Sequence, residues 1–269
     1  MTRKDIMYLS ESTPMENLGR ELTRVEENLG QCDLEPRGVS VCATAPGPVV
    51  LFGAPGVGKG TQADALTEIW CIPKISTGEI LRTNVAKRTV LGIQAEETMR
   101  RGGLVLDRLI TEMVASRLSI SDTAAGFILD GFPRTVQQVQ WLEEHLATHR
   151  NCGPLAIIHL YMEPQKIIAR IIHRRVCLHC NAIYNTDLKP PKQNGRCDKD
   201  GSALVQRGDD RIEVLRERLD LYKRETEPLI ERYRSRRSFM TVDADRPALN
   251  VTKDIVNGIA LGSQLMERK

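Results

Sequence analysis

A glycine-rich loop with a single lysine is the first segment of this 269-residue chain whose residue types and spacing point to chemistry. It reads GAPGVGKGT over residues 53–61, after the apolar run at 49–52 and before a helical pattern. Glycines let successive backbone amides point at phosphate oxygens, and the amino end of the helix adds partial positive charge. We therefore predict a phosphate-binding loop in which Lys59 reaches the terminal phosphates.

The residue after the lysine departs from the general form of this motif. Serine or threonine is usual there, whereas this chain has Gly60 followed by Thr61. We expect Thr61 to be the nearby hydroxyl, with Mg²⁺ held partly through water. A tight glycine turn between strand and helix is the alternative interpretation, and it explains the glycines but not Lys59 at this spacing.

Three cysteines and an aspartate form a second candidate site. Cys177 and Cys180 lie in one short turn, and after sixteen intervening residues Cys197 and Asp200 lie in another turn of the same length. Two turns of this kind, joined by a hairpin, can hold Zn²⁺ with three thiolates and one carboxylate in tetrahedral geometry. The spacing therefore predicts a structural zinc site.

The fourth ligand and the metal itself have alternatives. Asp198 lies two residues before Asp200, and His179 lies inside the first turn. Three free cysteines without a metal are a further alternative, which leaves their spacing unexplained. The chain has seven cysteines, an odd number that suits a metal site better than a framework of disulfides, so we expect a reducing compartment.

The elements between these sites must position them. Short apolar runs at 49–52, 127–129, 156–161 and 239–242 are separated by long helical stretches, which predicts a parallel sheet covered by helices on both faces. Thr135 is expected to stand before one helix, and the pair Asp209 and Asp210 before a helical run that continues through Tyr233. The apolar period vanishes between 177 and 208, which predicts an irregular insert whose folding energy comes from the metal.

The first 47 residues are predicted to be an extension of the folded domain at 48–269. Apolar residues at spacings of three and four over 15–29 predict a short amphipathic helix. Prolines and glycines over 30–48 predict a linker. The helix is expected to dock either on its own domain or on a partner.

Composition excludes several classes of protein. Hydrophobic residues make up 41% and charged residues 27% of the chain, which is typical of a globular protein. The net charge of +3 is too small to indicate a nucleic-acid partner. No stretch approaches the ~20 apolar residues of a membrane span, and the start of the chain lacks a secretory signal. We expect a cytoplasmic location, because the acidic extension weakens a mitochondrial transit interpretation.

Several blocks beyond the glycine-rich loop resemble those of adenylate kinases. The loop continues as GAPGVGKGTQA, and five blocks follow in the family's order: ISTGEILR (75–82), LVLD (104–107), GFILDGFPRTVQQ (126–138), RIIHRR (170–175) and QRGDD (206–210). The resemblance covers about residues 49–269. It extends to the zinc-bearing lid of some bacterial members, including a variant in which aspartate replaces the fourth cysteine.

The resemblance implies a fold and a reaction. The implied fold is α/β, with a P-loop, a parallel five-stranded sheet flanked by helices, an AMP-binding helical segment at 76–105 and a zinc-stabilised lid insert at 171–211. The implied reaction is reversible transfer of the terminal phosphoryl group of MgATP to AMP, which gives two ADP. Mg²⁺ with ATP and a structural Zn²⁺ are the implied cofactors, and we expect a monomer.

The resemblance also implies roles for the residues at the motif positions. The implied ATP-binding residues are Gly56, Val57, Gly58, Lys59, Gly60, Thr61, Arg170, Arg174, Ile183, Tyr184 and Arg246. The implied AMP-binding residues, with Gln138 at the adenine edge, are Thr77, Arg82, Gly103, Leu104, Val105, Gly131, Phe132, Pro133, Arg134, Gln138, Arg207 and Arg218. The implied catalytic residues are Lys59, Arg134, Arg170, Arg174, Arg207 and Arg218. Asp130 would hold the water shell of Mg²⁺, and the implied zinc ligands are Cys177, Cys180, Cys197 and Asp200.

Two other functions fit part of the pattern. A GTP:AMP phosphotransferase would share these motifs, because the donor base rests on backbone where the sequence discriminates little. A catalytically silent nucleotide sensor or scaffold could use the N-terminal helix to recruit a partner. Loss of Lys59 or of an arginine would favour the sensor, and this sequence has lost none of them. Glu79, where many family members have aspartate, and the basic segment MRRGG at 99–103 depart from the family's pattern.

Overall fold

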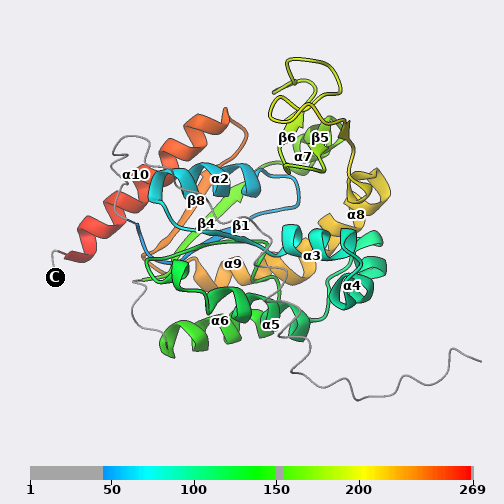
Figure 1. The fold of residues 1–269 in the computed structure, drawn as a ribbon. Coiled ribbons are helices and arrows are strands. Elements are labelled where there is room, and N and C mark those ends of the chain that lie inside the picture. The colour runs from blue at the N-terminus through cyan, green and yellow to red at the C-terminus, as the bar shows by residue number, and fades with distance from the viewer. Residues whose placement is uncertain (1–44, 149–153, 268–269) are drawn as a thin grey trace, which may run out of the picture.

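A parallel five-stranded sheet forms the centre of the molecule (Figure 1). The computed structural model describes residues 45–148 and 154–267, so the predicted helix at 15–29 lies outside the described residues. The strand order is β2-β3-β1-β4-β8. The strands are β1 (Val49–Phe52), β2 (Lys74–Ser76), β3 (Ile128–Asp130), β4 (Ala156–Tyr161) and β8 (Phe239–Asp243). The predicted α/β class and the parallel five-stranded sheet are confirmed.

Helices cover both faces of this sheet. They are α2 (Lys59–Trp70), α3 (Thr77–Ala86), α4 (Val90–Arg100), α5 (Asp107–Leu118), α6 (Val136–Thr148), α7 (Pro164–Ile172), α8 (Ile212–Leu221), α9 (Glu227–Tyr233) and α10 (Ala248–Glu267). Val49 and Leu51 of β1 pack in one apolar cluster with α2, α7, α8 and α10. Val50 and Phe52 belong to a second cluster, with α3–α6 and α9. A strand buried on both faces is continuously apolar, which is why 49–52 stands out in the sequence.

Helices α3 and α4 form a tightly joined pair beside the sheet. The Thr89 hydroxyl caps α4 by accepting a hydrogen bond from the Gly92 backbone N–H at 3.1 Å. A Cβ atom at Gly92 would lie 2.1 Å from the carbonyl oxygen of Asn84, so only glycine permits this approach. Helices α3 and α4 therefore form one structural unit.

The predicted insert is a separate small sheet. Antiparallel strands β5 (Arg174–Cys177), β6 (Ile183–Asn185) and β7 (Leu204–Val205) pair in the order β6-β5-β7. The insert lies between α7 and α8 in the chain and projects away from the central sheet (Figure 1). Its buried cluster consists of Cys177, Tyr184 and Cys197, so two of its three members are the candidate metal ligands.

Three local features of the structure differ from what the sequence pattern indicates. Strand β2 was not evident from an apolar run, because it has three residues and begins with Lys74. Strand β3 is shifted by one residue and ends at Asp130. The helical run expected to extend from Asp209 to Tyr233 is interrupted by a π-helical turn at Tyr222–Thr226.

No helix in the two described ranges is both long and apolar enough to cross a membrane.

Candidate active site

The glycine-rich loop joins β1 to α2, which is the context that the sequence predicts. Gly58 stands at the amino end of α2 with φ of 112°, a left-handed conformation that favours glycine. Gly56 has φ of +86°, and a Cβ atom there would lie 2.2 Å from the Cδ1 atom of Ile171. The loop therefore needs glycine both for its turn and for its close approach to α7.

Lys59 lies folded back against this loop. Its Nζ atom donates hydrogen bonds to the carbonyl oxygens of Gly53 (2.7 Å) and Ala54 (3.0 Å). The pKa of Lys59 falls from 10.5 to about 7, mainly because the ammonium group is buried; Asp130 opposes the shift, and nearby arginines, Arg134 foremost, contribute to it. An anion bound next to Lys59 would stabilise the charged ammonium form and so raise this pKa again.

Two adjoining cavities contain the predicted nucleotide residues. A cavity of about 940 Å³ is lined by the whole predicted ATP set: Gly56, Val57, Gly58, Lys59, Gly60, Thr61, Arg170, Arg174, Ile183, Tyr184 and Arg246. It also contains Phe132, Pro133, Arg207 and the proposed magnesium carboxylate Asp130. A smaller cavity of about 70 Å³ is lined by Thr77, Gly103, Leu104, Val105, Gly131 and Gln138. Arg82, Arg134 and Arg218 line both cavities, so positive charge lies between them.

The arginines around the cavities are held by two aspartates. Asp209 in the turn η3 (Gly208–Asp210) accepts hydrogen bonds from Arg207 and from Arg218, the latter at 2.9 Å. Arg174 pairs with Asp210, whose side chain is fully buried. Burial alone would raise the pKa of Asp209, but Arg207 and Arg218 hold that pKa well below its usual range.

A helix does follow Asp209 and Asp210, as predicted, but neither carboxylate caps it. Helix α8 begins at Ile212, and no side chain caps it. Both carboxylates form ion pairs with arginines instead. The position of acidic residues before a helix does not reveal these pairs.

Positive charge exceeds negative charge at the junction of the cavities. Burial lowers the pKa of Arg82 to about 10, and the neighbouring Arg207 contributes. Burial lowers the pKa of Arg218 to about 10 as well; Asp209 opposes the shift and Arg207 adds to it. Buried guanidinium groups with unmatched charge form a strong binding site for polyanions such as phosphates.

Oxygen ligands suited to Mg²⁺ lie on one side of the larger cavity. The Ser76 hydroxyl donates a hydrogen bond to Asp130 Oδ2 at 3.1 Å, and Thr61 lines the same cavity. Mg²⁺ prefers a carboxylate with several waters and phosphate oxygens as further ligands. Asp130 and Thr61 therefore fit a phosphate-bound Mg²⁺.

A polar residue next to the smaller cavity, Asp107, makes contacts that the sequence alone does not indicate. Asp107 accepts hydrogen bonds from the side chains of Gln138 (2.6 Å) and Thr135 (2.7 Å). Asp107 is the last residue of the family block LVLD, so the sequence marks the residue itself. Its partners Thr135 and Gln138 lie 28 and 31 residues away in the chain. Only the fold brings them together.

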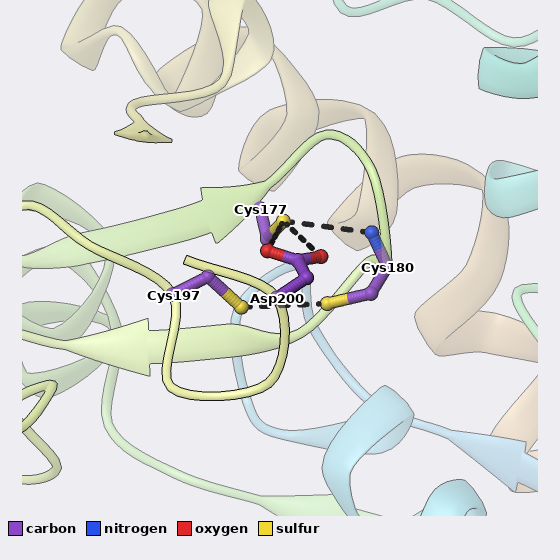
Figure 2. A group of neighbouring side chains, drawn as sticks. All are labelled: Cys177, Cys180, Cys197 and Asp200. Carbon is purple, nitrogen blue, oxygen red and sulfur yellow. Dashed lines mark hydrogen bonds between the residues drawn. The ribbon is translucent and has the colours of Figure 1, made fainter. Parts of the chain in front are cut away.

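The lid brings the four predicted metal ligands together (Figure 2). One ligand atom from each of Cys177, Cys180, Cys197 and Asp200 lies within 4.8 Å of all the others. The Cys180 and Cys197 sulfurs are 3.5 Å apart, and Cys177 Sγ lies 3.3 Å from Asp200 Oδ2. Tetrahedral zinc with Zn–S bonds of about 2.3 Å requires ligand atoms roughly 3.8 Å apart. The donor set and its spacing fit Zn²⁺.

The two alternative fourth ligands lie outside this cluster. Asp198 accepts a hydrogen bond from the Lys192 backbone N–H at 2.8 Å. His179 contacts the cluster only through Asp200, with its Nδ1 atom 3.1 Å from Asp200 Oδ2. The Asp200 carboxylate also accepts the Ser202 backbone N–H at 2.9 Å, and this bond is the main reason that its pKa lies well below the usual range.

Comparisons with known proteins agree with this geometry. The family model described as "Adenylate kinase" matches residues 51–238. The adenylate kinase of Archaeoglobus fulgidus is 44% identical over 207 residues, which cover 77% of this chain and 95% of the relative. The adenylate kinase of Exiguobacterium sibiricum is 43% identical, with coverage of 77% and 96%. The adenylate kinase of Methanocella arvoryzae is 42% identical, with coverage of 77% and 95%. The chain therefore belongs to the adenylate kinase family of nucleoside monophosphate phosphotransferases.

Proposed function

We propose that the protein catalyses reversible phosphoryl transfer from MgATP to AMP, with the donor in the larger cavity and the acceptor in the smaller one. One observation carries this proposal: Arg82, Arg134 and Arg218 line both cavities, between the Lys59 loop and the pocket of Gln138. Phosphates that enter from the two sides would meet at these guanidinium groups. Ile183, Tyr184 and Arg246 line the donor cavity, where the donor base is proposed to lie.

The reaction needs no nucleophile from the protein. An oxygen of the AMP phosphate attacks the terminal phosphorus of ATP, and the bridging oxygen leaves with ADP. Lys59 and the arginines Arg134, Arg170, Arg174, Arg207 and Arg218 neutralise the charge that collects on the transferring group. Asp130 would hold the water shell of Mg²⁺, and the bound ion would supply further positive charge at the phosphate oxygens.

Two segments are proposed to close over the nucleotides. Residues 76–105 contain the α3–α4 pair, and residues 171–211 contain the lid sheet. Both contribute residues to the cavity walls. Closure would exclude water, which otherwise competes with AMP for the transferred group. In the lid, Cys177, Cys180, Cys197 and Asp200 are proposed to bind a structural zinc.

We propose a monomer as the active unit. We propose a reducing compartment such as the cytoplasm, because Cys177, Cys180 and Cys197 are proposed to hold zinc as thiolates rather than to form disulfides.

A coupled assay of ADP formation tests the proposal. ATP and GTP are compared as donors, and AMP, CMP, UMP and GMP as acceptors. We expect rapid turnover with ATP and AMP and much slower turnover with the other pairs. Equal or faster turnover with GTP would favour the GTP:AMP phosphotransferase. Tight nucleotide binding without turnover would favour the nucleotide sensor.

ATP binding is expected to take up protons near neutral pH. The pKa of Lys59 is about 7 in the free protein, and polyphosphate stabilises its charged form, so binding at pH 7 takes up about half a proton. Above pH 7, free Lys59 is mostly neutral, and each further pH unit should weaken binding by up to about tenfold. Titration calorimetry at pH 6, 7 and 8 in buffers of different ionisation enthalpy measures the uptake.

A Lys59→Met variant separates this uptake from ionisation of the nucleotide itself. The phosphates of ATP titrate in the same way with both proteins. Uptake that is equal in wild type and variant would show that Lys59 is not the source.

A further inference from the structure

Asp107 lies behind the acceptor pocket and does not line either cavity. It is the first residue of α5, where the amino end of the helix stabilises a carboxylate. One carboxylate oxygen accepts the side-chain amide N–H of Gln138 at 2.6 Å, and the other accepts the Thr135 hydroxyl at 2.7 Å. The Gln138 side chain does line the acceptor pocket, and Gln138 is 2% exposed. Asp107 thus acts on the pocket only through Gln138.

The contacts of Gln138 permit only one orientation of its amide. A carboxylate accepts hydrogen bonds, so the amide nitrogen must face Asp107. The Arg134 backbone N–H donates at 2.8 Å, so the amide oxygen must face Arg134. Turning the amide over would place nitrogen against N–H and oxygen against carboxylate. The two partners therefore lock the direction of the amide.

The locked amide retains one donor and one acceptor for a ligand. Its nitrogen has a second N–H, and its oxygen has a second lone pair. Adenine offers a matching pair, with an acceptor at N1 and donors at N6. Hypoxanthine and guanine reverse this pattern, with a donor at N1 and an acceptor at O6. A freely rotating glutamine would bind either edge by turning over.

We propose that Asp107 is a positioning residue that gives the acceptor site its preference for 6-aminopurine over 6-oxopurine monophosphates. The inference rests on the proposed function, because it takes the smaller cavity as the site of the acceptor base. Thr135 supports the same geometry: its hydroxyl donates to Asp107 and accepts the Gln138 backbone N–H at 3.3 Å. Contacts within the protein therefore hold the Asp107 carboxylate in place.

The test compares AMP with IMP, which differ only at positions 1 and 6 of the base. Dissociation constants are measured by calorimetry for wild type, Asp107→Ala and Asp107→Asn, and KM and kcat are measured for both nucleotides. In Asp107→Ala we expect the preference for AMP over IMP to fall about tenfold, a typical value for one well-placed hydrogen-bond pair. The KM for AMP should rise while kcat and the KM for ATP stay within about twofold.

Asparagine at position 107 is expected to restore most of the preference. Its side-chain oxygen still accepts from the Gln138 nitrogen, while the charge is lost. Glu112→Ala removes another carboxylate from α5, at a residue outside both cavities, and should behave as wild type.

The outcomes separate this inference from the proposed function. Binding constants do not depend on turnover, so a wild type that binds AMP but does not phosphorylate it would contradict the function alone. An AMP-to-IMP binding ratio that stays at the wild-type value in Asp107→Ala would overturn the role of Asp107, even if that variant melts at a lower temperature.

Discussion

Replacement of Lys59 with methionine is expected to lower kcat about 10³-fold, the loss typical when one group that stabilises transition-state charge is removed. Lys59 is the only lysine in the glycine-rich loop, and its Nζ atom lies within hydrogen-bond distance of two loop carbonyls. Methionine keeps the length and apolar stem of the side chain but cannot place positive charge on a transferring phosphate. The measurement is kcat for ADP formation from ATP and AMP.

The fold is expected to survive this change. The pKa of Lys59 falls from 10.5 to about 7 on folding, so between these values the unfolded chain binds more protons and stability rises with pH. At pH 7 the charge of Lys59 therefore opposes folding, and Lys59→Met should melt at or above the wild-type temperature. Lys253→Met, at an exposed position of α10, is the matched control and should leave kcat unchanged. A kcat within tenfold of wild type in Lys59→Met would refute the proposed role.

Removal of zinc is expected to lower the melting temperature by about 10 °C. The described lid has few buried apolar side chains, and two of the three residues in its buried cluster are the proposed zinc ligands Cys177 and Cys197. A metal at about 10³ times its dissociation constant stabilises by about 4 kcal/mol. Each kcal/mol shifts the melting temperature of a protein of this size by roughly 2–4 °C. Calorimetry with and without a chelator measures the shift, and metal analysis measures release.

Variants in the two chelating turns identify the ligands. Asp200→Ala should weaken zinc binding, whereas Asp198→Ala should not. Cys180→Ser should reproduce the effect of the chelator, and Leu178→Ala, whose side chain is 73% exposed in the same turn, should not. Trypsin should also cleave the exposed lid faster once the metal is gone. The zinc site would be disproved if chelation released no metal and left both melting and cleavage unchanged.

The sequence predicted those parts of the fold that depend on long apolar runs. Strands β1 and β4 stand out because they are almost wholly buried, and the family's blocks marked the residues that line both cavities. Strand β2 did not stand out, because three residues that include a half-buried lysine carry too little pattern. The interruption of the helix before Glu227 was missed because a π turn keeps helical composition.

The roles of the acidic residues were harder to predict than those of the basic ones. Asp107, Asp209 and Asp210 each lie beside a motif residue, but their functions depend on partners that only the fold supplies. Asp210 meets Arg174 across 36 positions of the chain, and Asp107 meets Gln138 across 31. The local sequence shows that each of these residues is acidic, but it does not show which side chain the carboxylate binds.

The ion pairs of Asp209 and Asp210 affect how tightly a nucleotide can be held. Arg174, Arg207 and Arg218 are each held in an ion pair with one of these aspartates. Freezing a long, flexible side chain at an interface costs about 1 kcal/mol of conformational entropy. Here that entropy is lost when the protein folds rather than when the ligand binds. If phosphate binds these guanidinium groups, as proposed, the two aspartates compete with it, so the products are held less tightly and can leave at each turnover.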